Sequence, residues 1–372
     1  MDSKRKIPGL DILRIIACIS VYSMHYCAME LEESKEAIAT FRESAWAKSI
    51  FGLFWNGEAT VVFFVMAGFF ITYRRYNSEE DIVRTCIYRC LNILVPTLIV
   101  IFFTAGVTFI LKFVNMSDMF SVVDIIKDVV KLIIGLPGDK HIHYAYPLWF
   151  QHYIFIGYLA GYTFVYIFRR DNRIKYITYL IVLLYTLVNS EYMYMIFFGM
   201  LAGELCTGRY KNTVSRIFKN NKICYMMLFA MLSILAAVFD INYDSPIIYG
   251  PSVFIISVIL VLFFCISMND YQEGKTNIRN KRIYYIINRL SADSYSCYLI
   301  HFFIFCSVMR IIYKITLKFS FFWVNQAAGC IILYIVMTVV LWLFGDLFHQ
   351  FVLRPLNKLY DFIWRKISKV YL

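Results

Sequence analysis

Charged residues are scarce in this sequence: they make up 17% of its 372 residues, whereas 60% are hydrophobic and 19% aromatic. Soluble domains carry about a quarter charged residues, so the composition excludes an ordinary soluble domain. No Cys-x-x-Cys pair occurs among the ten cysteines, which argues against a zinc cluster and against a disulfide framework. Internal repeats and low-complexity tracts are also missing, and we expect no appended soluble domain and no metal.

The apolar residues that are present gather in runs of about twenty, the length at which a helix crosses the hydrocarbon core of a bilayer. The predicted fold class is therefore all-α, a polytopic membrane protein with one transmembrane domain over residues 1–372. The runs between charged breaks predict about ten spans, at residues 10–28, 50–73, 93–113, 148–168, 174–189, 191–207, 223–240, 247–267, 292–313 and 325–350.

Lys and Arg are distributed unevenly over the two sides that these spans define. Of the 37 basic residues, 26 lie on the side of the N-terminus, ten lie on the other side, and Arg14 lies within a span. By the positive-inside rule the side with 26 is cytoplasmic, and an even number of spans places both termini there. The net charge of +12 then follows from topology in a multi-pass protein of the cell membrane, and we expect no nucleic-acid partner.

The first apolar run follows Lys4, Arg5 and Lys6, as the core of a signal peptide would. Arg14 interrupts the run, and no small-x-small cleavage site follows it, so we expect the segment to remain in the protein. Outside the spans, residues 121–134 have an amphipathic pattern that predicts a helix on the outer interface. Packing of this helix against the bundle is favoured over a role at a substrate entrance.

Arg14 and His25 are the most informative residues of the first span. Their separation of eleven positions returns both to nearly the same helix face, roughly 16 Å apart along the axis. A charge in mid-membrane is costly, so Arg14 should face the bundle interior and meet a partner or a ligand. The alternatives are snorkelling toward the cytoplasm and pairing with Asp11. His25 has the chemistry of a general base or a transient nucleophile.

Other polar residues are weaker candidates. Arg74, Arg75, Arg84 and Arg89 form a cytoplasmic cluster suited to binding phosphate groups, although flanking arginines are ordinary at a membrane surface. Glu58 lies at the predicted depth of His25, where it could orient the imidazole or bind a hydroxyl group. His301 is more typical of a helix-packing hydrogen-bond partner than of a catalyst. Asp346 and His349, three positions apart, could pair with each other.

Five segments resemble, in order, the acyltransferase-3 family of integral-membrane enzymes. They are Gly9-Leu10-Asp11-x-x-Arg14 with His25, Val62–Ile71, Pro147-Leu148-Trp149-Phe150, Phe197–Gly203 and Ser294–His301. The family's Arg and His, separated by ten residues, are matched by Arg14 and His25, and its His-Leu-Trp-Phe segment by the one containing Trp149. Ala67 and Pro147 depart from the family's usual Ser and His, and only Arg89 remains of its Arg-rich run.

The resemblance implies transfer of an acyl group, most simply acetyl, from cytoplasmic acetyl-CoA to a hydroxyl of an extracytoplasmic glycan or lipid-linked sugar. His25 and Arg14 would be catalytic, Asp11, Glu58, Trp149 and His301 supporting, and the cytoplasmic arginines would bind acyl-CoA. A secondary transporter or flippase for a glycan or small anionic solute is the alternative, although we find no inverted repeat. A structural scaffold would tolerate replacement of Arg14 and His25.

Overall fold

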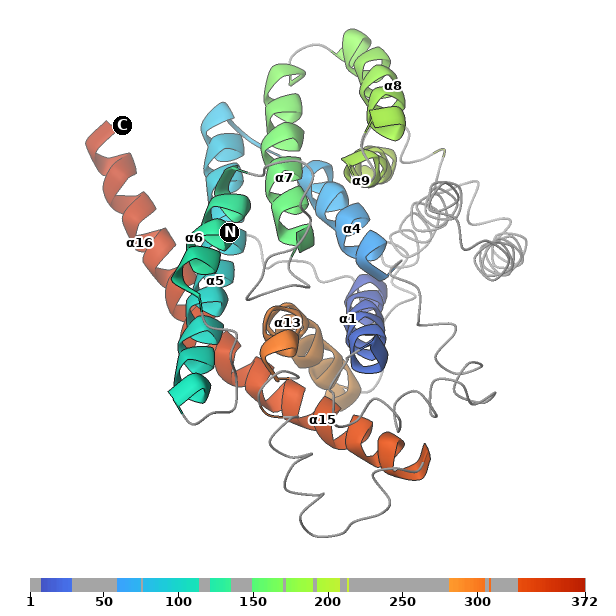
Figure 1. The fold of residues 1–372 in the computed structure, drawn as a ribbon. Coiled ribbons are helices and arrows are strands. Elements are labelled where there is room, and N and C mark those ends of the chain that lie inside the picture. The colour runs from blue at the N-terminus through green and yellow to red at the C-terminus, as the bar shows by residue number, and fades with distance from the viewer. Residues whose placement is uncertain are drawn as a thin grey trace. The chain divides into compact units, whose positions relative to one another are not determined.

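A computed structural model describes residues 8–28, 59–74, 76–113, 121–134, 149–169, 172–189, 193–207, 281–304 and 327–371, together with residues 213 and 308. This part of the chain is helical and contains no strand (Figure 1). The helices are α1 (Pro8–Ala28), α4 (Ala59–Tyr73), α5 (Glu79–Phe113), α6 (Val122–Ile134), α7 (Trp149–Ile167), α8 (Asn172–Asn189), α9 (Met193–Thr207), α13 (Lys281–Phe303), α15 (Ala327–Phe348), the π-helix η4 (His349–Leu353) and α16 (Arg354–Tyr371).

The all-helical prediction is confirmed for this part of the chain, and eight predicted spans overlap its helices. The spans at 223–240 and 247–267 lie outside the described residues. By length and hydropathy, two of the described helices could cross a membrane, Glu79–Ile110 and Ile332–Lys366, and three shorter helices are also apolar. The count of ten spans and the side of the termini stay predictions. The helix expected at 121–134 is present as α6.

Two helices begin well before the apolar runs that predicted them. Helix α5 starts at Glu79 rather than at residue 93, and α13 starts at Lys281 rather than at 292. The Ser78 hydroxyl accepts a hydrogen bond from the Asp81 amide at 3.1 Å, and three acidic residues in the first turn of α5 suit the helix dipole. A search for apolar runs misses helical turns that carry charge.

The described helices fall into two compact units. The first unit holds α1 up to Ala17, α4, α5 up to Cys90, α7 from Tyr153, α8, α9 and the start of α13. The second holds the remainder of α1, α5, α7 and α13, together with α6, α15, η4 and α16.

In the first unit, glycines allow α4 and α9 to pack backbone against backbone. A Cβ at Gly68 would lie 1.9 Å from the Ile196 carbonyl oxygen, and a Cβ at Gly199 would lie 1.9 Å from that of Val65. The Thr72 hydroxyl donates to the Met200 carbonyl at 2.6 Å across the same contact. Small residues drive such packing in apolar surroundings. The two glycine-containing segments that resemble the family are therefore one helix–helix contact.

Helix α8 joins the same unit through an ion pair with α9. The Lys175 ammonium contacts the Glu204 carboxylate, and the two side chains are only 12% and 17% exposed. A pair shielded to this degree stabilises the unit only while both charges are present, because either charge alone would remain without its partner.

In the second unit, a proline leaves one backbone acceptor of α5 without its usual donor. Pro96 has no N–H, so the Asn92 carbonyl lacks the bond that an α-helix normally provides from four residues on. The Tyr295 hydroxyl of α13 donates to that carbonyl at 3.0 Å. This bond satisfies the acceptor and attaches α13 to α5, as is needed where water is excluded.

Helices α1, α13 and α15 pack together in this unit through short-range contacts. The Ser23 and Tyr334 hydroxyls are 2.7 Å apart, and the Cys18 thiol donates to the Ser294 carbonyl at 3.3 Å. A Cβ at Gly345 would lie 2.4 Å from the Cys297 sulfur, so α15 lies directly on α13. These contacts fix the part of α1 that carries His25.

Candidate functional site

Arg14 and His25 lie on one continuous helix, α1, and both side chains are half-buried. The prediction that one helix carries both residues is therefore confirmed. Arg14 belongs to the first compact unit and His25 to the second, so each has its own surroundings.

In the first unit, Arg14 is surrounded by aromatic and charged groups. Its guanidinium carbon lies 6.0 Å from the centroid of the Phe70 ring, at the outer limit of a cation–π contact. The Asp11 carboxylate attracts the guanidinium, and the Arg89 guanidinium repels it. Tyr158 of α7 also interacts with Arg14. Two like charges within electrostatic range of each other favour an anionic ligand.

Arg89 is exposed and begins a chain of hydrogen bonds through two tyrosines. It bonds to the Tyr162 hydroxyl, Tyr162 bonds to Tyr76, and the Tyr76 hydroxyl donates to the Ile71 carbonyl at 2.7 Å. Since each hydroxyl donates only one hydrogen bond, Arg89 donates to Tyr162, Tyr162 donates to Tyr76, and Tyr76 donates to the Ile71 carbonyl. Burial raises the pKa of Tyr76 to about 12, so this phenol keeps its proton at any physiological pH.

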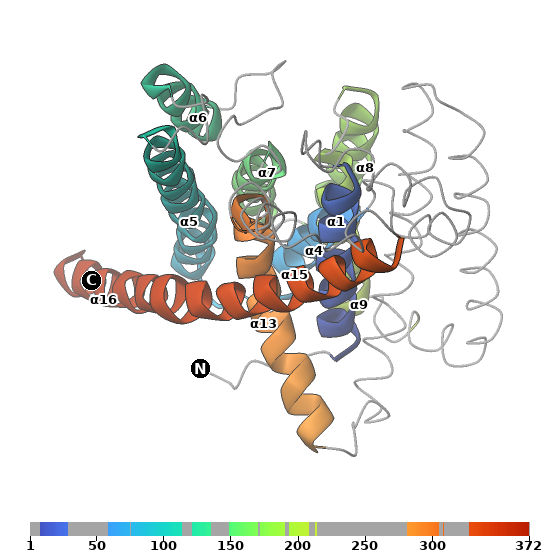
Figure 2. The same cartoon turned by 60° about the horizontal axis from the view of Figure 1, so that its bottom comes forward.

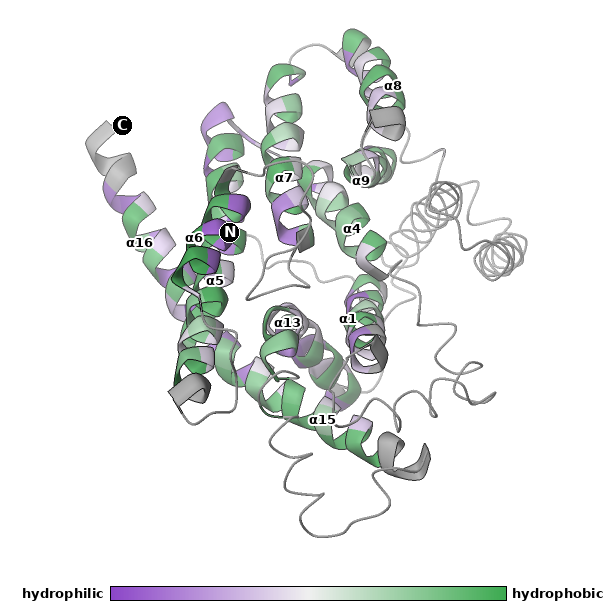
Figure 3. Ribbon diagram, in the orientation of Figure 1, coloured by the Kyte–Doolittle hydropathy of each residue, from purple (hydrophilic) through white to green (hydrophobic). Residues whose placement is uncertain are grey.

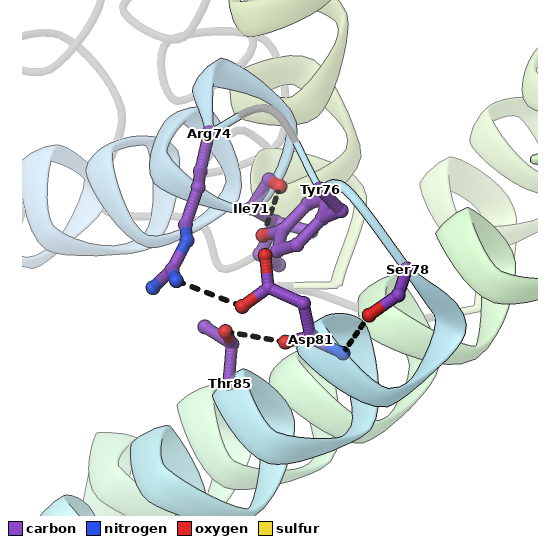
Figure 4. Close-up of polar contacts among 6 residues, drawn as sticks. All are labelled: Ile71, Arg74, Tyr76, Ser78, Asp81 and Thr85. Atoms are coloured by element: carbon purple, nitrogen blue, oxygen red, sulfur yellow. Dashed lines mark hydrogen bonds and ion pairs between the residues drawn. The ribbon is translucent and has the colours of Figure 1, made fainter. Parts of the chain in front are cut away.

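Arg74 lies at the end of α4, beside the same tyrosine (Figure 4). Its guanidinium donates to the Asp81 carboxylate at 3.0 Å and lies 5.8 Å from the Tyr76 ring centroid. The Arg74 side chain is 46% exposed, and an exposed ion pair of this kind contributes about 0–1 kcal/mol. A phosphate could therefore take the place of Asp81 at little cost.

The loop between α4 and α5 is also attached to the end of α7. The Arg169 guanidinium donates to the Asn77 carbonyl at 2.7 Å and lies 4.0 Å from the Glu79 carboxylate. The Tyr166 hydroxyl donates to the same carboxylate at 3.4 Å. These contacts hold the loop that carries Tyr76 beside the helix that carries Tyr158 and Tyr162.

In the second unit, His25 lies against His301 of α13. The two ring centroids are 5.0 Å apart, and the ring planes are inclined by 35°. His301 is buried, with 1% of its surface exposed. Its Nδ1 hydrogen-bonds to the Tyr298 carbonyl, which requires Nδ1 to carry the proton because a carbonyl only accepts. The neutral ring then has its basic nitrogen at Nε2.

Aromatic rings pack around His301 and around the residue next to His25. The Tyr298 ring centroid is 5.2 Å from that of His301, and Phe150 of α7 meets Tyr298 edge-to-face at 4.3 Å. Tyr26, which is fully buried next to His25 in the chain, packs against Tyr334 at 5.3 Å. The imidazole pair therefore lies in a largely apolar setting with few ways to rotate.

The structure describes some of the other predicted site residues and not others. Glu58 and Arg75 lie outside the described residues, and Trp149 is the first residue of α7. Arg84 precedes Arg89 by five positions, about 140° around α5, so the two side chains do not share a helix face.

The predicted pairing of Asp346 with His349 is wrong. The His349 Nδ1 lies 3.0 Å from the buried Asp293 carboxylate, whereas Asp346 accepts a hydrogen bond from Gln350 at 2.6 Å. The π-helical turn that begins at His349 changes the side-chain positions on which the i, i+3 expectation depends.

Two tyrosines of the first unit, Tyr158 and Tyr162, lie in the candidate site but were not predicted from the sequence. Tyr158 and Tyr162 are four positions apart on α7 and so share a face. That spacing was the available signal, but in a chain with 29 tyrosines it does not stand out.

Comparison with known proteins gives one match. The sequence model of a family described as an acyltransferase domain matches residues 7–346. The match includes every described candidate residue on α1, α4, α5, α7 and α13. No curated protein and no solved structure matches the chain.

Proposed function

This chain belongs to the acyltransferase-3 family and is an acyltransferase; on that premise we propose that it moves an acyl group, most simply acetyl, from cytoplasmic acyl-CoA to a hydroxyl of an extracytoplasmic glycan. It would act as a multi-pass protein of the cell membrane, with acyl-CoA as co-substrate. The observation that carries the proposal is the close contact of the His25 ring with the His301 ring. His25 lies on the same helix as Arg14, which interacts with Asp11, Arg89 and Tyr158.

Donor binding is assigned to the first unit. The diphosphate and 3′-phosphate of coenzyme A carry negative charge, and guanidinium groups bind such oxygens with charge-assisted, often bidentate bonds. Arg89 and Arg74 are exposed at this cluster, and the Tyr162 hydrogen bond orients Arg89. Arg14, half-buried beside Phe70, would meet the deeper part of the donor and hold its pantetheine arm.

Acyl transfer is assigned to His25 in the second unit. The imidazole takes the proton of the acceptor hydroxyl while the hydroxyl oxygen attacks the thioester carbonyl carbon. The carbon–sulfur bond then breaks, and the coenzyme A sulfur leaves with the pair of electrons and takes up a proton. His301, with its Nδ1 proton committed to the Tyr298 carbonyl, would hold the His25 ring at the angle that the reaction needs.

A transporter or flippase is the second candidate, since a half-buried cation such as Arg14 would also suit the passage of an anionic solute. Purified protein in sided vesicles distinguishes the two functions. Labelled acetyl-CoA is added on the face that carries the Arg74 loop, and a hydroxyl-bearing glycan is enclosed on the other. We expect acyl label in the glycan with the parent, and little with Arg14→Ala or His25→Ala.

The exposed Lys127→Ala of α6 is the control, because its charge lies outside both clusters. Movement of unmodified glycan across the vesicle membrane, with no acyl label, would support the transporter instead. Equal transfer by the parent and by correctly inserted His25→Ala would refute the proposed chemistry.

A further inference from the structure

Helix α16 presents four cations together with three exposed apolar side chains. Arg354, Lys358, Arg365 and Lys366 are exposed. Leu359, Phe362 and Ile363 are 49%, 54% and 43% exposed. At about 100° per residue, the seven residues fall within roughly half of the helix circumference. We call this surface the basic-apolar face.

The basic-apolar face points away from the helices of its own unit. Tyr360, on the other side of α16, is buried, and its hydroxyl lies 3.4 Å from the Leu91 carbonyl of α5. Lys366 remains beside the apolar residues, since its ammonium lies 4.8 Å from the Phe362 ring centroid. The helix is thus attached along one side, and the side that carries both the charge and the apolar side chains is exposed.

The face continues from the exposed apolar ridge of α15. That ridge includes Val339, Leu343 and Leu347, and it extends to Phe351 of η4, which is 73% exposed. Helices α15, η4 and α16 follow one another without a break (Figure 2), and Figure 3 shows the change from the largely apolar α15 to the mixed polar and apolar α16. The continuous helix Ile332–Lys366 contains an apolar stretch that could cross a membrane, but at about 1.5 Å per residue its 35 residues are longer than the roughly 30 Å hydrocarbon core. Acyl chains would therefore cover the apolar ridge of α15, and α16, whose charged residues begin at Arg354, would lie where headgroups begin.

A helix with cations on one flank and exposed Leu, Phe and Ile beside them has the pattern of helices that lie in a membrane interface. We propose that the basic-apolar face of α16 binds anionic phospholipid headgroups, with Arg354, Lys358, Arg365 and Lys366 on the phosphates and Leu359, Phe362 and Ile363 among the first acyl carbons. Bound lipid would anchor α16 on α5. This proposal does not depend on the acyltransferase chemistry.

The test uses the full chain in nanodiscs of zwitterionic lipid alone or with one third of the lipid replaced by phosphatidylglycerol. Hydrogen exchange of the backbone amides of residues 354–366 is measured by mass spectrometry. Each Lys or Arg near an anionic surface strengthens attachment about fivefold, so we expect exchange to slow by about fivefold or more in the anionic discs. The slowing should disappear at 1 M salt, where screening shortens to about 3 Å.

The variant Lys358→Gln/Arg365→Gln/Lys366→Gln should lose the dependence on anionic lipid, whereas the charge-retaining Lys358→Arg/Arg365→Lys/Lys366→Arg should keep it. Equal exchange in both kinds of disc would overturn the proposal. Slowing that persists in the charge-removed variant would also overturn the proposal. Slowing that rises with the number of chains per disc would overturn it and would identify a second copy of the chain as the occupant.

Discussion

The hydrogen bond from Tyr295 to the Asn92 carbonyl should be stabilising because of Pro96. Tyr295→Phe removes the 3.0 Å bond and leaves an acceptor that the helix cannot satisfy itself. An unmade bond to a buried acceptor costs about 1–3 kcal/mol. Since both residues are half-buried, we expect a loss near the lower end, about 1–2 kcal/mol in the free energy of unfolding.

The proline is what makes this bond valuable, and a double-mutant cycle tests that directly. The alanine introduced by Pro96→Ala brings an N–H that can bond to the Asn92 carbonyl in the ordinary helical way. In that background Tyr295→Phe should cost about 0.5 kcal/mol or less, which gives a coupling of about 1 kcal/mol between the two positions.

Tyr360→Phe provides the matched control. The Tyr360 hydroxyl lies 3.4 Å from the carbonyl of Leu91, the residue before Asn92, and the helix already supplies that carbonyl with the amide of Val95. Unfolding in mixed micelles with increasing SDS, followed by circular dichroism, measures all the variants. If Tyr295→Phe costs the same with and without Pro96, or no more than Tyr360→Phe, the explanation is wrong.

Three further predictions concern packing, charge and catalysis. Gly199→Ala should lower the free energy of unfolding by about 3 kcal/mol, because its Cβ would meet a carbonyl oxygen, whereas Gly106→Ala, with nothing within 4 Å, should be neutral or stabilising in the same SDS titration. Lys175→Met should destabilise by about 2–4 kcal/mol through the charge left on Glu204, and adding Glu204→Leu should recover most of that loss; a double variant as unstable as the single one would contradict this. His301→Phe should lower kcat for acyl transfer by about tenfold to a hundredfold with little change in KM for acetyl-CoA, and an unchanged kcat would remove its positioning role.

The helical class and the alignment of Arg14 with His25 could be predicted because both depend on local spacing. Apolar runs identify the helices, and eleven positions return to one face of α1. The starts of α5 and α13 could not be found in this way, since their charged first turns are stabilised by capping and by packing on other helices.

Contacts between distant segments account for most of what the sequence left open. His301 is more than 270 positions from His25, and nothing in either local pattern indicates that their rings meet. The hydrogen-bond chain from Arg89 through Tyr162 and Tyr76 likewise joins three parts of the chain. By contrast, the basic-apolar face of α16 depends only on helical spacing within residues 354–366 and could be predicted from the sequence. The positive-inside rule uses the basic residues of this segment only as a signal of topology.

The most direct test of the central claim is the division of labour between Arg14 and His25. Initial rates of acyl transfer, measured against acetyl-CoA concentration, give kcat and KM for Arg14→Gln and His25→Gln beside the parent. We expect Arg14→Gln to raise KM for acetyl-CoA by about tenfold or more, because a charge-assisted contact is lost. His25→Gln should lower kcat by about a hundredfold or more at an unchanged KM. A His25→Gln protein that keeps the parent's kcat would contradict the account.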